Sequence, residues 1–263
     1  MGKKWAVWIA AGMLMLGLTV LLYPAVSNAV NRQHGSYAIQ ELREQMNEMD
    51  TAQLEVALEE AREYNRQLNR TGTADVQWYE QILDFGKGMI GYITVEKLDM
   101  MLPIYHGVST EVLERGVGHL PSSAFPVGGT GNHTVLTGHT GLPSAKLFTD
   151  LAELSIGDQF QVNVGTHSVE YQVDQILVVL PQETEELMPA VGQDYCTLVT
   201  CTPYGVNSHR LLVRGSRVEA TEETVSDTEN IPEPEKDHRW VLLLLVLVAV
   251  ILFTWKRKWK KDG

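Results

Sequence analysis

Two runs of apolar residues without charged side chains lie near the ends of the chain, from Trp5 to Tyr23 and from Trp240 to Trp255. As α-helices they would reach about 28 Å and about 24 Å, against the roughly 30 Å hydrocarbon core of a bilayer. The tryptophans that bound the second run suit the two membrane interfaces. The pattern therefore predicts a transmembrane helix near each end, at residues 5–23 (an anchor or a signal segment) and at residues 240–255.

Basic residues flank both runs on their outer sides. Lys3 and Lys4 precede the first run, and five lysines and arginines follow the second within residues 256–263. Because cytoplasmic flanks are enriched in such residues, residues 1–4 and 256–263 are predicted to be cytoplasmic tails, with everything between the two helices outside the cell. The small residues of Ser27-Asn28-Ala29 also fit a signal-peptidase site, so cleavage of the first segment stays open. In either case we expect a protein of the cell membrane.

The periodicity of the sequence changes between these ends. Apolar residues recur at helical spacing through residues 34–70, and Thr71-Gly72-Thr73 marks a break, which predicts an N-terminal helical region over residues 34–88. Short runs rich in aliphatic and β-branched residues then alternate with glycine-rich turns. They predict strands at residues 92–98, 133–139, 159–164, 169–180, 195–201 and 210–218, with helical turns at 109–115, 144–151 and 183–187. Many short strands with few helices are typical of a closed β-barrel, here over residues 89–218.

The distribution of charge predicts a linker and argues against nucleic acid as a partner. The net charge is −12, and no basic patch lies outside the cytoplasmic tail, which argues against nucleic-acid binding. Residues 219–239 hold eight carboxylates and two prolines with almost no aliphatic residues. That composition predicts a solvated, acidic linker between the barrel and the second transmembrane helix.

The chain has two cysteines, Cys196 and Cys201. On one strand they would lie roughly 16 Å apart, far beyond the about 6 Å that a disulfide allows. Free thiols are therefore expected, on opposite faces of the strand. Cys201 ends the strand beside a Thr-Pro-Tyr-Gly turn, where a thiol is held rigidly and can still be approached, while Cys196 suits a buried core position.

A cysteine nucleophile needs a base and a group that stabilises an oxyanion. His139 ends a predicted strand between two glycines, but the sequence pattern leaves other histidines open: His106, His119, His133 and His209. Arg210 starts the strand after the Cys201 turn and would bring a permanent positive charge. Arg214 has the same strand parity, so alternation does not separate the two arginines.

Residues 197–215 read TLVTCTPYGVNSHRLLVRG and resemble the active-site segment of class C (pilin-polymerising) sortases of Gram-positive bacteria. The upstream segments 91–93, 102–107, 116–120, 137–139 and 141–148 resemble the same family. The resemblance covers roughly residues 34–218 and implies a mainly β fold, a sortase-type closed barrel. It identifies Cys201 as the catalytic cysteine, His139 as the catalytic histidine and Arg210 as the catalytic arginine.

One departure from the family concerns a lid over the cysteine, usually built on an Asp-Pro-aromatic motif. The corresponding residues here read ADVQWY, from Ala74 to Tyr79, with no proline and a spacing longer by one residue. A plain surface segment is one interpretation. The other is a lid in which Asp75 pairs with Arg210 and Trp78 covers Cys201.

The resemblance implies a reaction that needs neither metal nor cofactor. The thiolate of Cys201 would cleave an LPxTG-like sorting signal between Thr and Gly, giving a thioacyl enzyme that a pilin lysine resolves. The expected partners are secreted pilin subunits and the lipid bilayer. The alternatives are a housekeeping sortase that attaches proteins to cell-wall precursor and a non-catalytic, membrane-tethered binder of sorting signals. A papain-like protease is disfavoured because the histidine precedes the cysteine.

Overall fold

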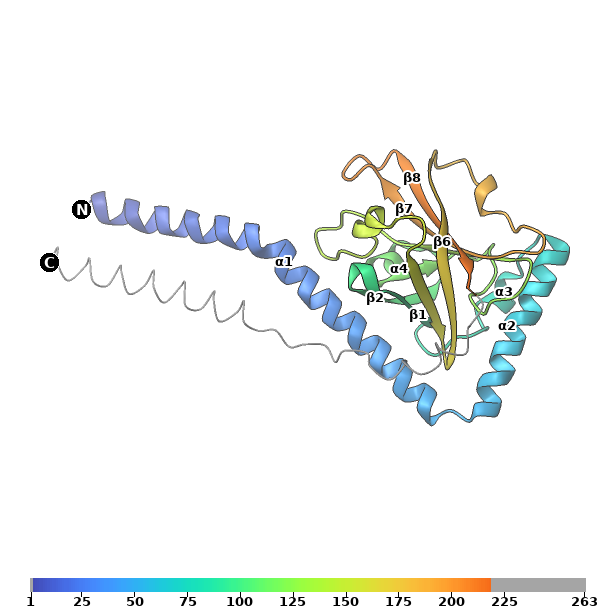
Figure 1. The fold of residues 1–263 in the computed structure, drawn as a ribbon. Helices are drawn as coiled ribbons and strands as arrows, with labels where there is room; N and C mark the ends of the chain where they lie inside the picture. Colours follow the sequence, from blue (N-terminus) through green and yellow to red (C-terminus); the bar gives the residue numbers. More distant parts are fainter. Residues whose placement is uncertain (1, 219–263) are drawn as a thin grey trace. The chain divides into compact units, whose positions relative to one another are not determined.

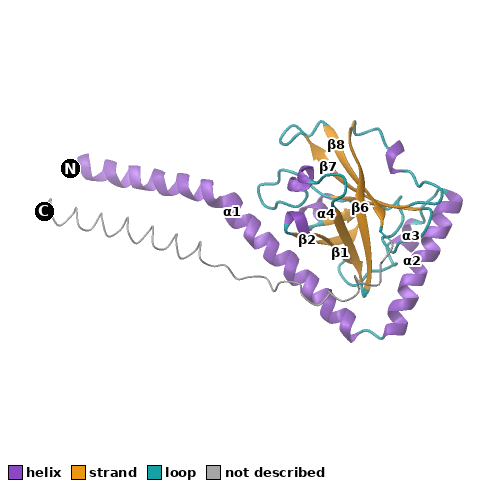
Figure 2. Cartoon of the chain, in the orientation of Figure 1, coloured by secondary structure: helices purple, strands orange, loops and turns teal. Residues whose placement is uncertain are grey.

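Three helices precede the first strand in the computed structural model, which describes residues 2–218 (Figures 1 and 2). Helix α1 runs from Gly2 to Glu48, α2 from Thr51 to Thr71 and α3 from Val76 to Tyr79. The Asp50 carboxylate accepts from the backbone N–H of Ala52 at the start of α2, and Gly72 ends α2 in a left-handed conformation with φ 67°. The predicted break at residues 71–73 is therefore confirmed.

Helix α1 is one unbroken element that joins the first predicted transmembrane segment to the start of the predicted helical region. The sequence pattern predicts two separate segments here, whereas in the structure one helix runs through both of them and keeps Pro24 within it. Residues 8–48 form the one helix within residues 2–218 that is long and apolar enough to cross a membrane, with a mean hydropathy of 2.0 in its apolar window.

The strands close into a barrel in the order β1-β2-β3-β4-β7-β8-β6-β5, with β5 pairing back to β1. Their bounds are β1 Met89–Val95, β2 Met100–His106, β3 Val117–His119, β4 Asn132–Thr137, β5 Gln159–Val164, β6 His167–Val179, β7 Asp194–Thr202 and β8 His209–Arg217. The predicted closed barrel is confirmed. The strands β2 and β3 were not predicted: β2 carries Pro103 and lacks clear alternation, and β3 is only three residues long.

Short helices connect the strands. They are η1 Glu96–Leu98, α4 Thr110–Arg115, η2 Thr149–Glu153 and η3 Glu185–Leu187. Each of the three predicted helical turns thus has a counterpart, although η2 begins later than expected. Its start is delayed because residues 141–148 form an irregular loop in which Leu142 and Ala145 make an isolated bridge.

Helix α2 packs on the barrel through one face. Leu54, Leu58, Ala61 and Leu68 are buried there, which gives the helix the apolar stripe that the sequence periodicity predicted. Asn65, also buried, donates its side-chain amide to the Phe125 carbonyl at 3.0 Å and accepts from the Phe125 N–H at 2.7 Å. This pair of hydrogen bonds fixes the helix against the segment between β3 and β4.

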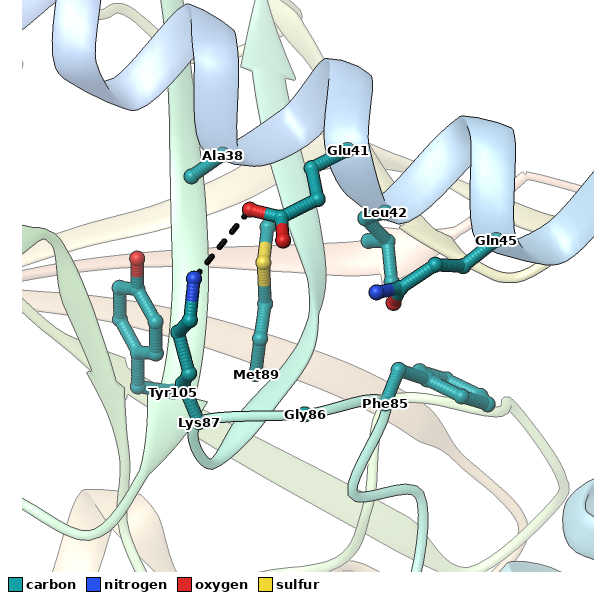
Figure 3. A pocket seen from close by; sticks show the side chains of 9 residues that line it. All are labelled: Ala38, Glu41, Leu42, Gln45, Phe85, Gly86, Lys87, Met89 and Tyr105. Atoms are coloured by element: carbon teal, nitrogen blue, oxygen red, sulfur yellow. Dashed lines mark hydrogen bonds and ion pairs between the residues drawn. The ribbon is translucent and has the colours of Figure 1, made fainter.

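The second half of α1 also packs on the barrel. Ile39, Leu42 and Met46 are buried in the same core as the barrel residues. Around them, Arg32 pairs with Asp99 at 2.6 Å and Lys87 with Glu41 at 3.3 Å. Figure 3 shows Lys87 reaching from the turn before β1 to Glu41 over a small pocket that α1 lines together with Met89 and Tyr105.

The predicted acidic linker (219–239), the second transmembrane helix (240–255) and the basic tail (256–263) lie outside the described residues.

Candidate active site

Cys201 lies near the end of β7, directly opposite Arg210 near the start of β8. The two strands run antiparallel and are joined by the turn of residues 203–208, so the end of one strand meets the beginning of the other. Residues directly opposite each other in such a ladder place their Cβ atoms about 5 Å apart on one face. The thiol and the guanidinium group therefore belong to the same end of the barrel.

His139 reaches this end through the parallel pairing of β4 with β7. Thr137 is in register with Val199, and the Gly138 N–H donates to the Val199 carbonyl at 3.0 Å. The Thr200 hydroxyl donates to the Gly138 carbonyl at 2.7 Å, which continues the contact past the last paired residues. His139 lies two residues beyond Thr137, and Cys201 lies two residues beyond Val199. Because Thr137 and Val199 are paired in parallel strands, His139 follows the end of β4 at the level where Cys201 lies near the end of β7.

The turn between β7 and β8 holds the Arg210 side chain. Its Nη1 donates to the His209 carbonyl at 3.0 Å and to the Asn207 carbonyl at 3.3 Å. Asn207 adopts a left-handed conformation with φ 59°, and its N–H donates to the Pro203 carbonyl at 2.9 Å. Arg210 makes no ion pair among residues 2–218, so its charge is free to meet an anionic group.

Arg214, which the sequence pattern did not separate from Arg210, forms an ion pair with another residue. Its guanidinium group makes two hydrogen bonds to the Asp174 carboxylate, at 2.9 and 3.1 Å, and lies 4.2 Å from the centre of the Tyr195 ring. Such a bidentate pair neutralises the arginine. The structure therefore leaves Arg210 as the available cation near Cys201.

The side chains at this end differ in exposure from the residues beneath them. Cys201, His139 and Arg210 are each half-buried, whereas Thr200 and Gly138 are buried. Solvent or a peptide can reach the first three. The His139 ring has no hydrogen-bond partner within the described part of the chain, so both ring nitrogens are available for proton transfer.

The other candidate histidines have partners of their own. His133 bonds the Thr197 hydroxyl at 2.7 Å and the Met188 carbonyl at 3.0 Å, and burial lowers its pKa. His119 lies wholly inside the core, where it bonds Tyr79 and the Ala124 carbonyl, and burial lowers its pKa to about 4. His106 bonds two backbone carbonyls, and His209 bonds the neighbouring Ser208 hydroxyl at 2.9 Å. These contacts give the four histidines structural roles.

Cys196 differs from Cys201 in burial. Both thiols are free and both lie on β7, as the spacing argument required. The Cys196 side chain is completely buried, and that burial raises its pKa well above the ordinary thiol value. A thiol that stays protonated away from solvent is a poor nucleophile, so Cys201 is the reactive candidate.

Asp75 and Trp78 are not brought to Cys201 and Arg210. The Asp75 carboxylate caps α3, accepting from the N–H groups of Gln77 and Trp78 at 3.1 Å each. The Trp78 ring packs edge-on against Tyr64 of α2, with ring centres 5.4 Å apart. In this conformation Asp75 makes no ion pair with Arg210, and the segment serves as a short helix packed on α2.

Three supporting residues were not singled out from the sequence. Phe148 is fully buried against Gly138, where an added Cβ would come within 2.8 Å of its ring. Tyr204 lies over Gly141, so the β7–β8 turn and the loop after His139 touch. Thr200 supplies the hydrogen bond to Gly138 described above. The glycines at positions 138 and 141, on either side of His139 and Thr140, are the signal in the sequence for such close packing.

Among residues 2–218, no group of three or more His, Cys, Asp or Glu side chains is arranged to hold a metal ion. The groups that the end of the barrel around Cys201 offers for chemistry are a thiol, an imidazole and a guanidinium group.

Comparison with known proteins identifies this barrel. The sequence profile described as "Sortase domain" matches residues 93–218, from within β1 to the residue after β8. The crystal structure of sortase C1 from Streptococcus agalactiae superposes with a TM-score of 0.68 at 41% identity, covering 70% of this chain and 100% of that one. The chain belongs to the sortase family.

Other sortases agree with this assignment. Sortase C of Streptococcus pneumoniae has a TM-score of 0.65 at 39% identity, covering 70% of this chain and 98% of that one. Together with sortase C1, it confirms the predicted likeness to class C sortases. Sortase A of Bacillus anthracis is 30% identical over 132 residues, which are 50% of this chain and 61% of that protein. The chain thus spans about three fifths of the length of this curated relative.

Proposed function

We propose that this sortase is a cysteine transpeptidase with Cys201 as nucleophile, Arg210 as oxyanion stabiliser and His139 as general acid and base. The observation that carries the proposal is the register of three strands. β8 sets Arg210 opposite Cys201, and β4 delivers His139 alongside the end of β7. A nucleophile, a proton carrier and a fixed cation on one accessible end are the groups that acyl transfer needs.

The first step cleaves an LPxTG-like sorting signal. The Cys201 thiolate attacks the carbonyl carbon of the Thr–Gly bond, and Arg210 stabilises the oxygen that gains negative charge. His139, as imidazolium, gives its proton to the departing glycine amine. The C–N bond breaks and a thioester joins the threonine to Cys201.

The second step transfers the acyl group to a lysine amine of a pilin subunit. Neutral His139 takes a proton from the incoming amine, whose lone pair attacks the thioester carbonyl. The C–S bond breaks, the thiolate returns and an isopeptide bond remains. Repetition with further subunits polymerises a pilus. The likeness to Sortase C of Streptococcus pneumoniae, whose structure is described as bearing on pilin substrate specificity, supports this substrate class.

The membrane arrangement belongs to the same proposal. Helix α1 supports an anchor at residues 5–23, and the composition of residues 240–255 supports a second one. Basic flanks favour cytoplasmic termini and an extracellular barrel. A sorting signal that emerges from the membrane would then meet the enzyme on the same side of the bilayer.

A housekeeping sortase that attaches proteins to cell-wall precursor is the second candidate. The chain also matches proteins named Sortase A, from Bacillus anthracis and from Corynebacterium diphtheriae (a lid mutant that is 42% identical), so the likeness extends beyond proteins named sortase C. The two candidates differ in the acceptor amine.

The test mixes the full-length enzyme in detergent with a candidate pilin that carries an LPxTG-like signal. The Cys201→Ala variant is the control. A ladder of multimers that resists heat and detergent, absent with the variant, is the expected result. Cleavage without a ladder favours the housekeeping or hydrolytic activity. No Cys201-dependent cleavage of any LPxTG-like substrate contradicts the proposal and favours the non-catalytic binder.

A further inference from the structure

Two asparagines of α1 contact the loop that follows His139. The Asn28 side-chain oxygen accepts from the Lys146 N–H at 2.9 Å, and the Asn31 side-chain amide donates to the Ser144 carbonyl at 3.2 Å. The asparagines are three residues apart and share one face of the helix. Both hydrogen bonds go to backbone groups, so together they hold the path of the loop and do not depend on its side chains.

Hydrogen bonds within the loop connect these two contacts to the backbone of His139. The Phe148 N–H donates to the His139 carbonyl at 3.0 Å, and the Thr149 N–H donates to the Lys146 carbonyl at 2.8 Å. The Thr149 hydroxyl in turn accepts from the Gly141 N–H at 3.1 Å. The segment from 139 to 149 is thereby tied together at several points. A displacement at Lys146 is carried to the backbone of His139.

Contacts with the barrel hold helix α1 in place beyond the two asparagines. Arg32, one residue after Asn31, pairs with Asp99 at 2.6 Å, and the helix then buries Ile39 and Leu42 against the barrel. On its other side, Asn28 lies about 8 Å along the helix axis beyond Tyr23, where the predicted membrane span ends. The two asparagines therefore lie between the membrane anchor and the part of α1 that packs on the barrel.

We propose that Asn28 and Asn31 are positioning residues, which hold His139 in place through the segment of residues 144–148. We call the two hydrogen bonds from Asn28 and Asn31 to the backbone of Lys146 and Ser144 the clamp. The role of His139 rests on the proposed function, whereas the clamp rests on these hydrogen bonds alone. The N-terminal helix is then a working part of the active site as well as an anchor. Cleavage after Ala29 would remove Asn28 from the enzyme.

The size of the effect follows from how strictly acyl transfer depends on geometry. A misplacement of about 1 Å of a catalytic group costs up to about 100-fold in rate. One lost hydrogen bond in a loop tied at several points lets the histidine move by less than that. We expect about a 10-fold loss in kcat, with KM for the sorting signal nearly unchanged, because the proposed effect of the two asparagines is on the position of His139.

The test compares two variants of equal charge in the full-length enzyme reconstituted in lipid vesicles. Asn28→Asp keeps an oxygen that accepts from the Lys146 N–H, so the clamp is retained. Asn31→Asp replaces the donor with an oxygen that faces the Ser144 carbonyl, so the clamp is lost. Gln33→Ala is the control, since Gln33 is an exposed amide on the same helix that bonds only Tyr37 among the described residues.

Three readouts separate positioning from stability. Hydrogen exchange of the amides of residues 141–148 reports the clamp without a substrate. The pH profile of Cys201 alkylation by iodoacetamide reports how the thiol senses His139, also without a substrate. The steady-state kcat and KM report the reaction. We expect Asn31→Asp to speed exchange, shift the alkylation profile and lower kcat, while Asn28→Asp and Gln33→Ala behave as the wild type.

Faster exchange with an unchanged alkylation profile would overturn the positioning role and leave a purely structural contact. Equal losses in Asn28→Asp and Asn31→Asp would overturn it too, since charge near the membrane would then explain both. A wild type that acts on no sorting signal would refute the proposed function. The exchange and alkylation results would still decide the clamp.

Discussion

Cys201 and Arg210 are direct partners in the antiparallel ladder of β7 and β8, which ends one pair further on, with Thr202 and His209. This pairing places the thiol one position before its strand leaves the barrel. The arginine reaches it from the next strand across a turn of six residues, 203–208. The cation is thus carried by a paired strand of the barrel.

The first prediction concerns the two arginines of β8. Arg210→Lys should lower kcat/KM by about 100-fold or more with an unchanged fold, because a lysine lacks the planar fork that meets an oxyanion. Arg214→Lys should instead lower stability, by about 1 kcal/mol, since it breaks the bidentate pair with Asp174. Steady-state kinetics and thermal denaturation of both variants measure the two effects. An Arg210→Lys enzyme with full kcat/KM would remove the oxyanion role.

The second prediction concerns acid sensitivity. The buried His119 has its pKa lowered to about 4, against about 6.5 in the unfolded chain. Between these values the unfolded chain binds more protons, so stability is fully present above about pH 6.5 and falls as the pH drops towards 4. A difference of this size corresponds to about 3 kcal/mol. Burial lowers the pKa of His133 and His167 in the same direction.

Urea denaturation at pH 7 and pH 5 measures this loss. His119→Gln should be less stable than the wild type at pH 7 but lose less stability on acidification. His209→Gln, which alters a histidine near the barrel rim, is the control and should follow the wild-type pH dependence. Equal acid sensitivity in His119→Gln and the wild type would exclude His119 as the cause.

Much of this architecture was predictable from local pattern. The strand at Gln159–Val164 and the helix end at Gly72 follow from alternation and from a residue that accepts positive φ. The strand β2 was missed because Pro103 interrupts its pattern. In the closed barrel its neighbours β1 and β3 supply the pairing that its own sequence does not predict.

The candidate site was predictable to the extent that its residues lie at strand ends. Sequence parity left Arg210 and Arg214 equivalent. The register that sets Arg210 opposite Cys201 and the tertiary contact of Arg214 with Asp174, 40 residues away, separate them. The contacts of Asn28 and Asn31 with the loop after His139 span more than 100 residues of sequence. No local pattern encodes such pairs, because they depend on how α1 packs on the finished barrel.

The third prediction tests the packing beneath His139. In Gly138→Ala the new Cβ would lie 2.8 Å from the Phe148 ring, which is fully buried and has no room to retreat. We expect about a 10-fold to 100-fold loss of kcat and a loss of about 1–3 kcal/mol of stability, the usual cost of overpacking. Kinetics and denaturant unfolding measure both.

Gly35→Ala is the matched control for that substitution. Its added Cβ would meet the Pro103 side chain at 3.5 Å, an ordinary van der Waals contact, inside helix α1. It should stabilise the protein by up to about 1 kcal/mol, through higher helix propensity, with unchanged kcat. If both alanine variants retained wild-type kcat, close packing at Gly138 would not matter for the position of His139.

The fourth prediction concerns the segment that the sequence suggested as a lid. Because the Asp75 carboxylate caps α3 and Trp78 packs on Tyr64, neither side chain shields Cys201 in this conformation. Asp75→Ala should cost about 1 kcal/mol of stability through the lost cap. Trp78→Ala should cost more, through lost apolar burial. Neither should change the rate at which iodoacetamide labels Cys201.

Labelling of the folded enzyme at fixed pH, followed by mass spectrometry of the Cys201 peptide, measures that rate. Cys196 is buried and should stay unlabelled, so it serves as an internal check that the variants remain folded. A several-fold faster reaction of Cys201 in both variants, with Cys196 still protected, would show that the segment covers the thiol for part of the time. The lid would then be an alternative state of α3, in which Asp75 gives up its cap to pair with Arg210.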